Sequence, residues 1–391
     1  MFTRCYPTIS DWINDIFGTN LALPVQSFGF FVALAFIAAA VVVSLELKRK
    51  EKEGLVQKQR KKVKVGEPAS LTELAINGFI GFIIGFKLLA VLFNYESCVA
   101  DPQGFVFSLK GNFIGGVIGA VIGAYLKYRE KAKTKLDKPK MEEVEVYPHQ
   151  LVGDLLIVAA ISGFIGAKVF NFLEAPQDLR DFMEDPGGNI FSGLTIYGGL
   201  IFGAIGVIWY ARKNNINILQ LADASAPALI LAYGIGRIGC HVAGDGDWGI
   251  DNTSAAPSWI PENLWSYTYP HNIINEGVPI PGCEGDHCFA LANPVYPTPI
   301  YETIACIIIF GILWSLRKRI KVPGMILALY LVFNGIERFF IERIRINTEY
   351  NIFGMTPSQA EIISLLFVIS GIGLGIYFHQ RYKKRNIPKP S

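Results

Sequence analysis

The chain is poor in charged residues. Aspartate, glutamate, lysine and arginine make up 18% of its 391 residues, whereas hydrophobic residues make up 51%. An ordinary soluble domain carries about 25% charged residues. This balance excludes an ordinary soluble domain and points to the long apolar runs of the chain.

Several signatures of other protein classes are also missing. The segment 1–24 lacks the charged start and immediate apolar stretch of a cleaved signal, so we expect it to be retained at the outer surface. The Gly-x-Gly-Arg at 234–237 ends an apolar run with no strand before it, which argues against a dinucleotide fold. No second ligand pair follows Cys283, His287 and Cys288 at finger-like spacing, so we expect no metal site. The spacing of Cys283 and Cys288 is compatible with a disulfide between them but does not establish one.

Long apolar runs recur along the chain. A helix needs roughly 20 residues to cross the hydrocarbon core of a bilayer. The sequence therefore predicts an all-α polytopic membrane protein with nine transmembrane helices, near 25–46, 73–95, 104–126, 150–173, 193–211, 218–239, 300–316, 323–345 and 359–379.

Basic residues gather in every second connection between these helices. Five such segments hold 27 of the 36 lysines and arginines, and the intervening connections hold almost none. Positive charge marks the cytoplasmic side of membrane proteins, whereas nucleic-acid binding would not require this alternation. We therefore expect the N-terminus outside, the C-terminus inside and no nucleic-acid partner.

Two segments of the chain resemble each other. Residues 81–128 and 163–210 each combine a glycine-rich helix bearing one lysine, Lys87 or Lys168, with a connection and a second helix that opens on Gly-Gly. This pattern predicts a duplicated helical hairpin. The domain division expected is an outer segment 1–24, a first helix with an inserted hairpin at 25–126, a membrane core at 150–380 with a small outer head at 241–298, and a basic cytoplasmic tail at 381–391.

A few charged residues lie inside predicted helices. Such residues usually face a cavity or a partner, because charge in lipid costs several kcal/mol. At 1.5 Å per residue, Arg237 lies roughly 28 Å from the inner end of its helix, and Lys168 and Glu342 about 25 Å from theirs. Asn334, Arg338, Glu342 and Arg345 fall at i, i+4, i+8 and i+11, which is one helical face. We expect these groups to line a wet cavity at the level of the outer headgroups.

Short motifs follow one another in the second part of the chain: GAKVFNF (166–172), YGGLIFG (197–203), ADASAP (222–227), GRIGCHVAGDGDWG (236–249), YPTPIYE (296–302), ERFFIERIR (337–345) and GMTPSQ (354–359). In this order they resemble motifs of the prolipoprotein diacylglyceryl transferases. The family signature Gly-Arg-x-Gly-Asn-Phe-x-Asn-Gly-Glu-x-x-Gly is similar to residues 236–249, which contain one additional residue. The resemblance covers about 150–380 and the first helix. Family members have seven helices, so the hairpin at 73–126 would add two.

The resemblance implies a reaction and its partners. Family members move diacylglycerol from phosphatidylglycerol to the lipobox cysteine thiol of a prolipoprotein signal peptide, at the outer leaflet of the bacterial inner membrane, and release glycerol phosphate. Membrane lipids are the other partners, and no cofactor or metal ion is expected. The catalytic residues implied are Arg237, Arg338, Glu342 and Tyr197, and the phospholipid-binding residues are Arg237, Gly198, Gly199, Lys168, Asp245 and Gly249.

The chain departs from the family pattern at the place where a proton acceptor is needed. The histidine of the family is Tyr197 here, its asparagines are Cys240 and Ala243, and its signature acid is shortened to Asp245. A tyrosine, with a pKa about 10, is a poor base at neutral pH. Tyr197 acting by hydrogen bonding, or His241 or Asp245 as acceptor, would preserve the reaction. A catalytically silent relative that binds phospholipid or scaffolds an envelope complex is the alternative, and a transporter is a third reading.

Overall fold

A computed structural model describes residues 4–23, 25–100, 105, 108, 110–190, 192–346 and 358–385. The chain divides into two compact units. Unit 1 comprises Met1–Val56, Pro148–Leu156 and Ile216–Ser391, and unit 2 comprises Gln57–Tyr147 and Ile157–Asn215. Each unit is described by itself.

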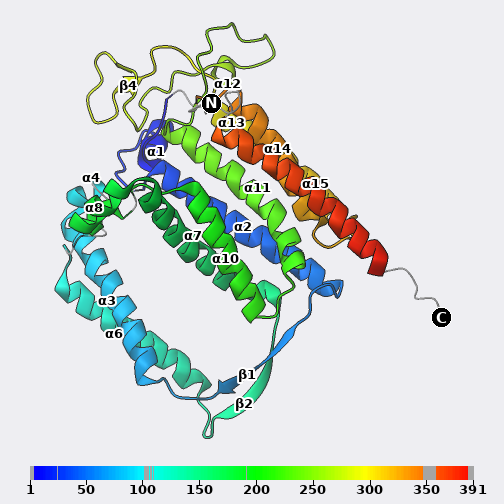
Figure 1. Cartoon of the computed structure of the whole chain (residues 1–391). Coiled ribbons are helices and arrows are strands. Elements are labelled where there is room, and N and C mark those ends of the chain that lie inside the picture. Colours follow the sequence, from blue (N-terminus) through cyan, green and yellow to red (C-terminus); the bar gives the residue numbers. More distant parts are fainter. Residues whose placement is uncertain are drawn as a thin grey trace. The chain divides into compact units, whose positions relative to one another are not determined.

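Unit 1 is a helical bundle around a central helix. α11 (Ile218–Ala243) packs against α2 (Ser27–Lys52), α13 (Thr298–Leu316) and α14 (Met325–Glu342), and α15 (Gln359–Arg385) packs on α14 (Figure 1). Half of the apolar window of α11 is buried, more than in any other candidate span of the described residues. α11 therefore positions the residues at its C-terminal end against three neighbouring helices.

A buried aspartate links the central helix to the start of α14. The Asp223 carboxylate accepts hydrogen bonds from the backbone N–H groups of Gly324, at 2.7 Å, and Leu327, at 3.1 Å. The first N–H groups of a helix lack partners within the helix, so the carboxylate satisfies donors that would otherwise be orphaned. Asp223 therefore has a structural role at the start of α14.

The segment between α11 and α13 folds around an aromatic cluster. It contains α12 (Glu262–Trp265) and the antiparallel pair β3 (Val278–Pro279) and β4 (Phe289–Ala290). Trp248, Tyr267, Tyr269 and Val295 are buried with Cys5 from the N-terminal segment, which precedes the short helix α1 (Ile9–Phe17). The predicted head is thus an ordered structure, and Cys283 and Cys288 form the disulfide that the spacing had left open.

Unit 2 contains two hairpins with the same internal contacts, as the repeat predicts. α3 (Leu71–Phe93) pairs with α6 (Phe113–Thr134), and α7 (Val152–Glu174), whose first turn belongs to unit 1, pairs with α10 (Ile196–Lys213). The short helices α4 (Tyr95–Ala100), α8 (Pro176–Glu184) and α9 (Pro186–Asn189) lie in the connections.

The two hairpins share a backbone contact and a lysine. A side chain on Gly85 would overlap the backbone of Gly115, and one on Gly166 would overlap the backbone of Gly198. Small residues allow such close helix approach in membranes. Lys87 donates to the carbonyl groups of Phe105, Ser108 and Lys110, and Lys168 to those of Asn189 and Ser192, so each lysine holds the connection of its own hairpin.

A charged ribbon in unit 2 was not predicted. β1 (Gln59–Val65) pairs antiparallel with β2 (Lys140–Val146), with Arg60 opposite Glu145 and Lys62 opposite Glu143 (Figure 1). From the sequence, both strands were expected to be parts of basic connections. Opposite charges across an antiparallel pair stabilise it, and this pairing could not be seen in segments more than 70 residues apart.

The chain leaves unit 1 at Val56 and returns to it at Pro148, which begins the 3-10 helix η1 (Pro148–Leu151). The return point is held to the end of α2 by Glu51, whose carboxylate accepts from the His149 backbone N–H at 2.9 Å and lies 2.7 Å from Nδ1 of the same residue.

The chain is an α-helical membrane protein. Six helical stretches of the described residues are long and apolar enough to cross a membrane: α2, α3, Pro148–Glu174, α11, α13 and Gln359–Lys384.

Helices α6, α10 and α14 occupy the other three predicted spans, but the start predicted for α6 was wrong. α6 begins at Phe113 because the Asn112 side chain caps it by accepting from the Gly115 N–H. The count of nine and the orientation stay predictions.

Substituting Gly85 with alanine should destabilise the α3–α6 hairpin by about 1–3 kcal/mol, because the added methyl group overlaps the Gly115 carbonyl and forces the helices apart. Gly78→Ala is the matched control, since a Cβ there meets its nearest atom at 3.5 Å. Thermal unfolding of both variants in detergent checks this. Equal stability of the two variants would contradict the close backbone contact.

Candidate active site

Arg237 lies buried near the C-terminal end of α11. Its side chain forms ion pairs with Asp247 and Glu302, and its Nη1 lies 3.5 Å from the Cys240 sulfur. The guanidinium also lies over the Tyr233 ring, 5.8 Å from the centroid. Its Nη2 is buried and has no hydrogen-bond partner among the described residues. Arg237 thus sits among opposite charges and keeps one donor group unused.

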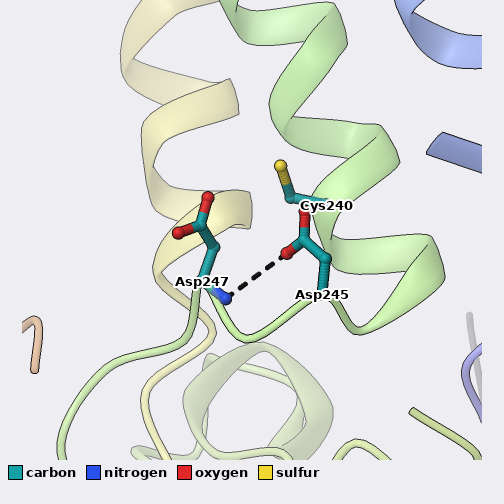
Figure 2. Close-up of side chains that lie close together, drawn as sticks. All are labelled: Cys240, Asp245 and Asp247. Atoms are coloured by element: carbon teal, nitrogen blue, oxygen red, sulfur yellow. Dashed lines mark hydrogen bonds between the residues drawn. The ribbon is translucent and has the colours of Figure 1, made fainter. Parts of the chain in front are cut away.

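The turn after α11 brings acidic residues back to its end. Gly244 ends the helix in the left-handed conformation, and Asp245 and Asp247 follow at once. Figure 2 shows both carboxylates beside Cys240, with the Asp247 N–H donating to Asp245 at 3.3 Å. Ligand atoms of these three residues lie within 4.8 Å of one another. The Asp247 carboxylate is already bound by two guanidinium groups, so this geometry fits an ion-pair network better than a cation site.

Glu302, on α13, is the centre of the network. It is fully buried and pairs with Arg237, with Arg338 at 3.5 Å and with Arg345 at 3.8 Å. It also accepts a hydrogen bond from the Tyr233 hydroxyl at 2.8 Å. Glu302 belongs to the motif YPTPIYE but was not among the site residues expected from the sequence. The signal was available, since the glutamate lies in an apolar helix where an ionised group needs a partner.

α14 contributes the second part of the network. Arg338 pairs with Glu342 at 3.2 Å, one helical turn further on, and the Ser358 hydroxyl donates to Glu342 at 2.6 Å. The residues 354–357 of the motif at 354–359 lie outside the described residues. Arg338 and Glu342, which the spacing places on one helical face, thus form an ion pair.

Arg345 reaches the network by a different route from the one predicted. The predicted single helical face was wrong at this residue, because α14 ends at Glu342. Arg345 instead forms a β-bridge with Gly249 and pairs with Asp247. Arg343 points elsewhere, is largely exposed and pairs with Glu361 at 3.0 Å.

Gly249 has a packing role in this arrangement. It is buried, its N–H donates to the Tyr296 carbonyl at 2.9 Å, and a Cβ there would overlap the Ile344 carbonyl oxygen. Any larger residue would therefore push away the strand-like segment that carries Arg345. The predicted contact of Gly249 with phospholipid stays a prediction.

His241 lies in the aromatic cluster of the head segment. It is buried, with Nδ1 3.1 Å from the Tyr269 hydroxyl and its ring 5.4 Å from the Tyr267 ring. Burial raises the pKa of Tyr269 well above its usual value, so its hydroxyl stays protonated and can donate to the imidazole. These contacts assign His241 to packing and weaken it as a candidate proton acceptor.

Four predicted site residues belong to unit 2. Besides its two carbonyl partners, the Lys168 ammonium lies 5.2 Å and 5.3 Å from the ring centroids of Phe172 and Phe182. Tyr197 is the second residue of α10 and is partly buried. Gly198 and Gly199 face α7, where Gly198 makes the close contact described above. Their predicted roles with lipid stay predictions.

Comparison with known proteins identifies one family. A sequence profile described as prolipoprotein diacylglyceryl transferase matches residues 134–377. Phosphatidylglycerol–prolipoprotein diacylglyceryl transferases from Clostridium tetani and Staphylococcus carnosus are 29% and 32% identical over 243 and 232 residues. These alignments cover 61% and 59% of this chain and 84% and 76% of the relatives. The profile begins at Thr134, the last residue of α6.

Substituting Gly249 with alanine should displace Arg345 from Asp247, because the backbone of residue 344 must move to accommodate the methyl group. We expect a loss of stability of about 1–3 kcal/mol. Gly236→Ala is the control, since a Cβ at that position meets nothing within 4 Å. Thermal unfolding of the purified variants measures the difference. A Gly249→Ala protein as stable as the control would show that the segment tolerates the displacement.

Proposed function

The chain belongs to the prolipoprotein diacylglyceryl transferase family, and from this premise we propose that it transfers the diacylglyceryl group of phosphatidylglycerol to the lipobox cysteine thiol of a prolipoprotein. The observation that carries the proposal is Arg237: a buried guanidinium at the end of an apolar helix, with one donor nitrogen unused. Arginine offers a planar fork that suits a phosphate.

The chemistry requires a fixed cation and a proton acceptor. The thiol sulfur forms a C–S bond with the glyceryl carbon, while the C–O bond to the phosphate breaks and its electron pair leaves with the phosphate oxygen. Arg237 stabilises the charge that gathers on this leaving group. Arg338, oriented by Glu342, is a second clamp. The products are the thioether-linked prolipoprotein and glycerol phosphate.

We assign the thiol proton to Asp245. Its carboxylate already lies close to a thiol, that of Cys240, at the outer end of α11 (Figure 2). His241 packs among aromatic rings, and the Tyr197 phenol is a weak base. As the family resemblance implies, Tyr197 then acts by hydrogen bonding, and Lys168, Gly198 and Gly199 bind phospholipid.

The topology completes the proposal. With nine spans, an external N-terminus and an internal C-terminus, the Arg237 network lies at the outer leaflet of the bacterial inner membrane, where the donor headgroup and the exported thiol meet. The basic connections support this orientation. Tyr197 in place of the family histidine favours the second candidate, a silent relative that binds phospholipid without transferring it.

The purified chain, supplied with labelled phosphatidylglycerol and a lipobox peptide, should lipidate the peptide. Arg237→Ala should lower kcat about 100- to 1,000-fold, the loss typical of removing one group that stabilises the leaving charge. Arg343→Ala is the matched control, because it removes an exposed arginine outside the network. If the folded wild-type chain binds the lipid but never lipidates the peptide, the silent relative is correct.

Asp245→Asn should lower kcat about 100- to 10,000-fold, since the amide cannot accept the thiol proton. The activity that remains should rise steadily with pH as the substrate thiol ionises in solution, near its usual pKa of about 8.5. Tyr197→Phe should cost less, because it removes only a hydrogen bond. If the Asp245→Asn enzyme keeps the wild-type pH profile, a group other than Asp245 accepts the thiol proton.

A further inference from the structure

Asp247 binds two arginines with one carboxylate. Its Oδ2 pairs with Arg237 and its Oδ1 with Arg345, so each oxygen meets a different guanidinium group. The two arginines come from separate parts of the chain, the end of α11 and the segment after α14. The carboxylate of one residue thus links two arginines that are distant in the sequence.

We propose that Asp247 is an internal placeholder for the phosphate of the donor lipid. Its carboxylate occupies the position between Arg237 and Arg345 until a phosphate displaces it. This inference rests on the proposed function for the identity of the lipid, and it adds Arg345 to the groups that hold the phosphate.

The shape of the pairing supports the assignment. A phosphodiester has two unesterified oxygens that share one negative charge, and it can bridge two guanidinium groups as this carboxylate does. The unused Nη2 of Arg237 is a further donor for a larger anion. A phosphate would therefore replace both ion pairs and gain a hydrogen bond.

Asp247 is also the member of the network that can leave. Its side chain is 28% exposed, whereas those of Arg237, Arg345 and Glu302 are 10%, 15% and 0% exposed. Its backbone carbonyl accepts from the Thr298 hydroxyl at 2.7 Å, which keeps the turn in place while the side chain rotates outward. The buried members stay paired with one another through Glu302.

A placeholder has a physical purpose here. Two guanidinium groups close together, with too few counter-charges, repel each other in surroundings of low polarity. Asp247 keeps them together before the lipid arrives. It also lowers the apparent affinity for anions by the fraction of time the position is free, so weakly held anions are excluded.

The test measures anion binding in the folded full-length protein, using glycerol phosphate as the probe. Asp247→Asn should bind it at least about tenfold more tightly than the wild type, because the competing charge is gone. Asp251→Asn is the charge-matched control: it removes the same charge four residues further along the chain, at an exposed position outside the ion-pair network, and its affinity should change less than about threefold. Arg345→Ala should weaken binding in both backgrounds.

Thermal unfolding with and without glycerol phosphate is the second measurement. Asp247→Asn should unfold at a lower temperature than the wild type without the anion and recover more with it, since a ligand stabilises the state it binds. Equal or weaker binding by folded Asp247→Asn, or equal tightening in Asp251→Asn, would overturn the proposal. If Asp247→Asn binds glycerol phosphate more tightly but the wild type lipidates no peptide, the placeholder role of Asp247 is supported and the transferase activity is contradicted. If the wild type lipidates the peptide but Asp247→Asn binds no more tightly, only the placeholder role is contradicted.

Discussion

The balance of opposite charges around Glu302 is the constraint on which the site depends. Three arginines and three carboxylates meet among apolar helices: Arg237, Arg338 and Arg345 with Asp247, Glu302 and Glu342. Moving a charged group out of water costs several kcal/mol, so each member requires its partners. The elements that converge on this end of unit 1 are therefore held by the groups that give the site its chemistry.

The sequence predicted much of the helical framework, because a helix that crosses a bilayer requires a long apolar run, which is visible in the sequence itself. It also singled out Arg237 as a charge inside a predicted helix, and it placed Arg338 and Glu342 on one helical face, since spacing along one helix determines which side chains share a face. It missed contacts that depend on tertiary structure. Glu302 lies 65 residues from Arg237 in the chain, and the Asp247–Arg345 pair depends on a bridge between Gly249 and a segment almost 100 residues away.

The acid of the family signature shows why spacing matters. Counting the signature from Gly236 without a gap makes Asp245 the counterpart of its acid, whereas Asp247, two residues further on, makes the ion pairs with the arginines. An alignment of residue types cannot distinguish two aspartates on one turn. Their contacts differ: the Asp247 carboxylate pairs with Arg237 and Arg345, whereas the Asp245 carboxylate accepts from the Asp247 N–H and lies beside Cys240 (Figure 2).

The Glu51–His149 contact bears on how so long a segment fits between two neighbouring elements of unit 1. It joins the two places where the chain leaves and re-enters unit 1, so the 91 residues between Val56 and Pro148 begin and end at one spot. A loop whose ends already touch can be lengthened at little entropic cost. The connection between α2 and η1 can therefore contain the α3–α6 hairpin and the β1–β2 ribbon without drawing these two elements apart, and its length places little demand on the stability of unit 1.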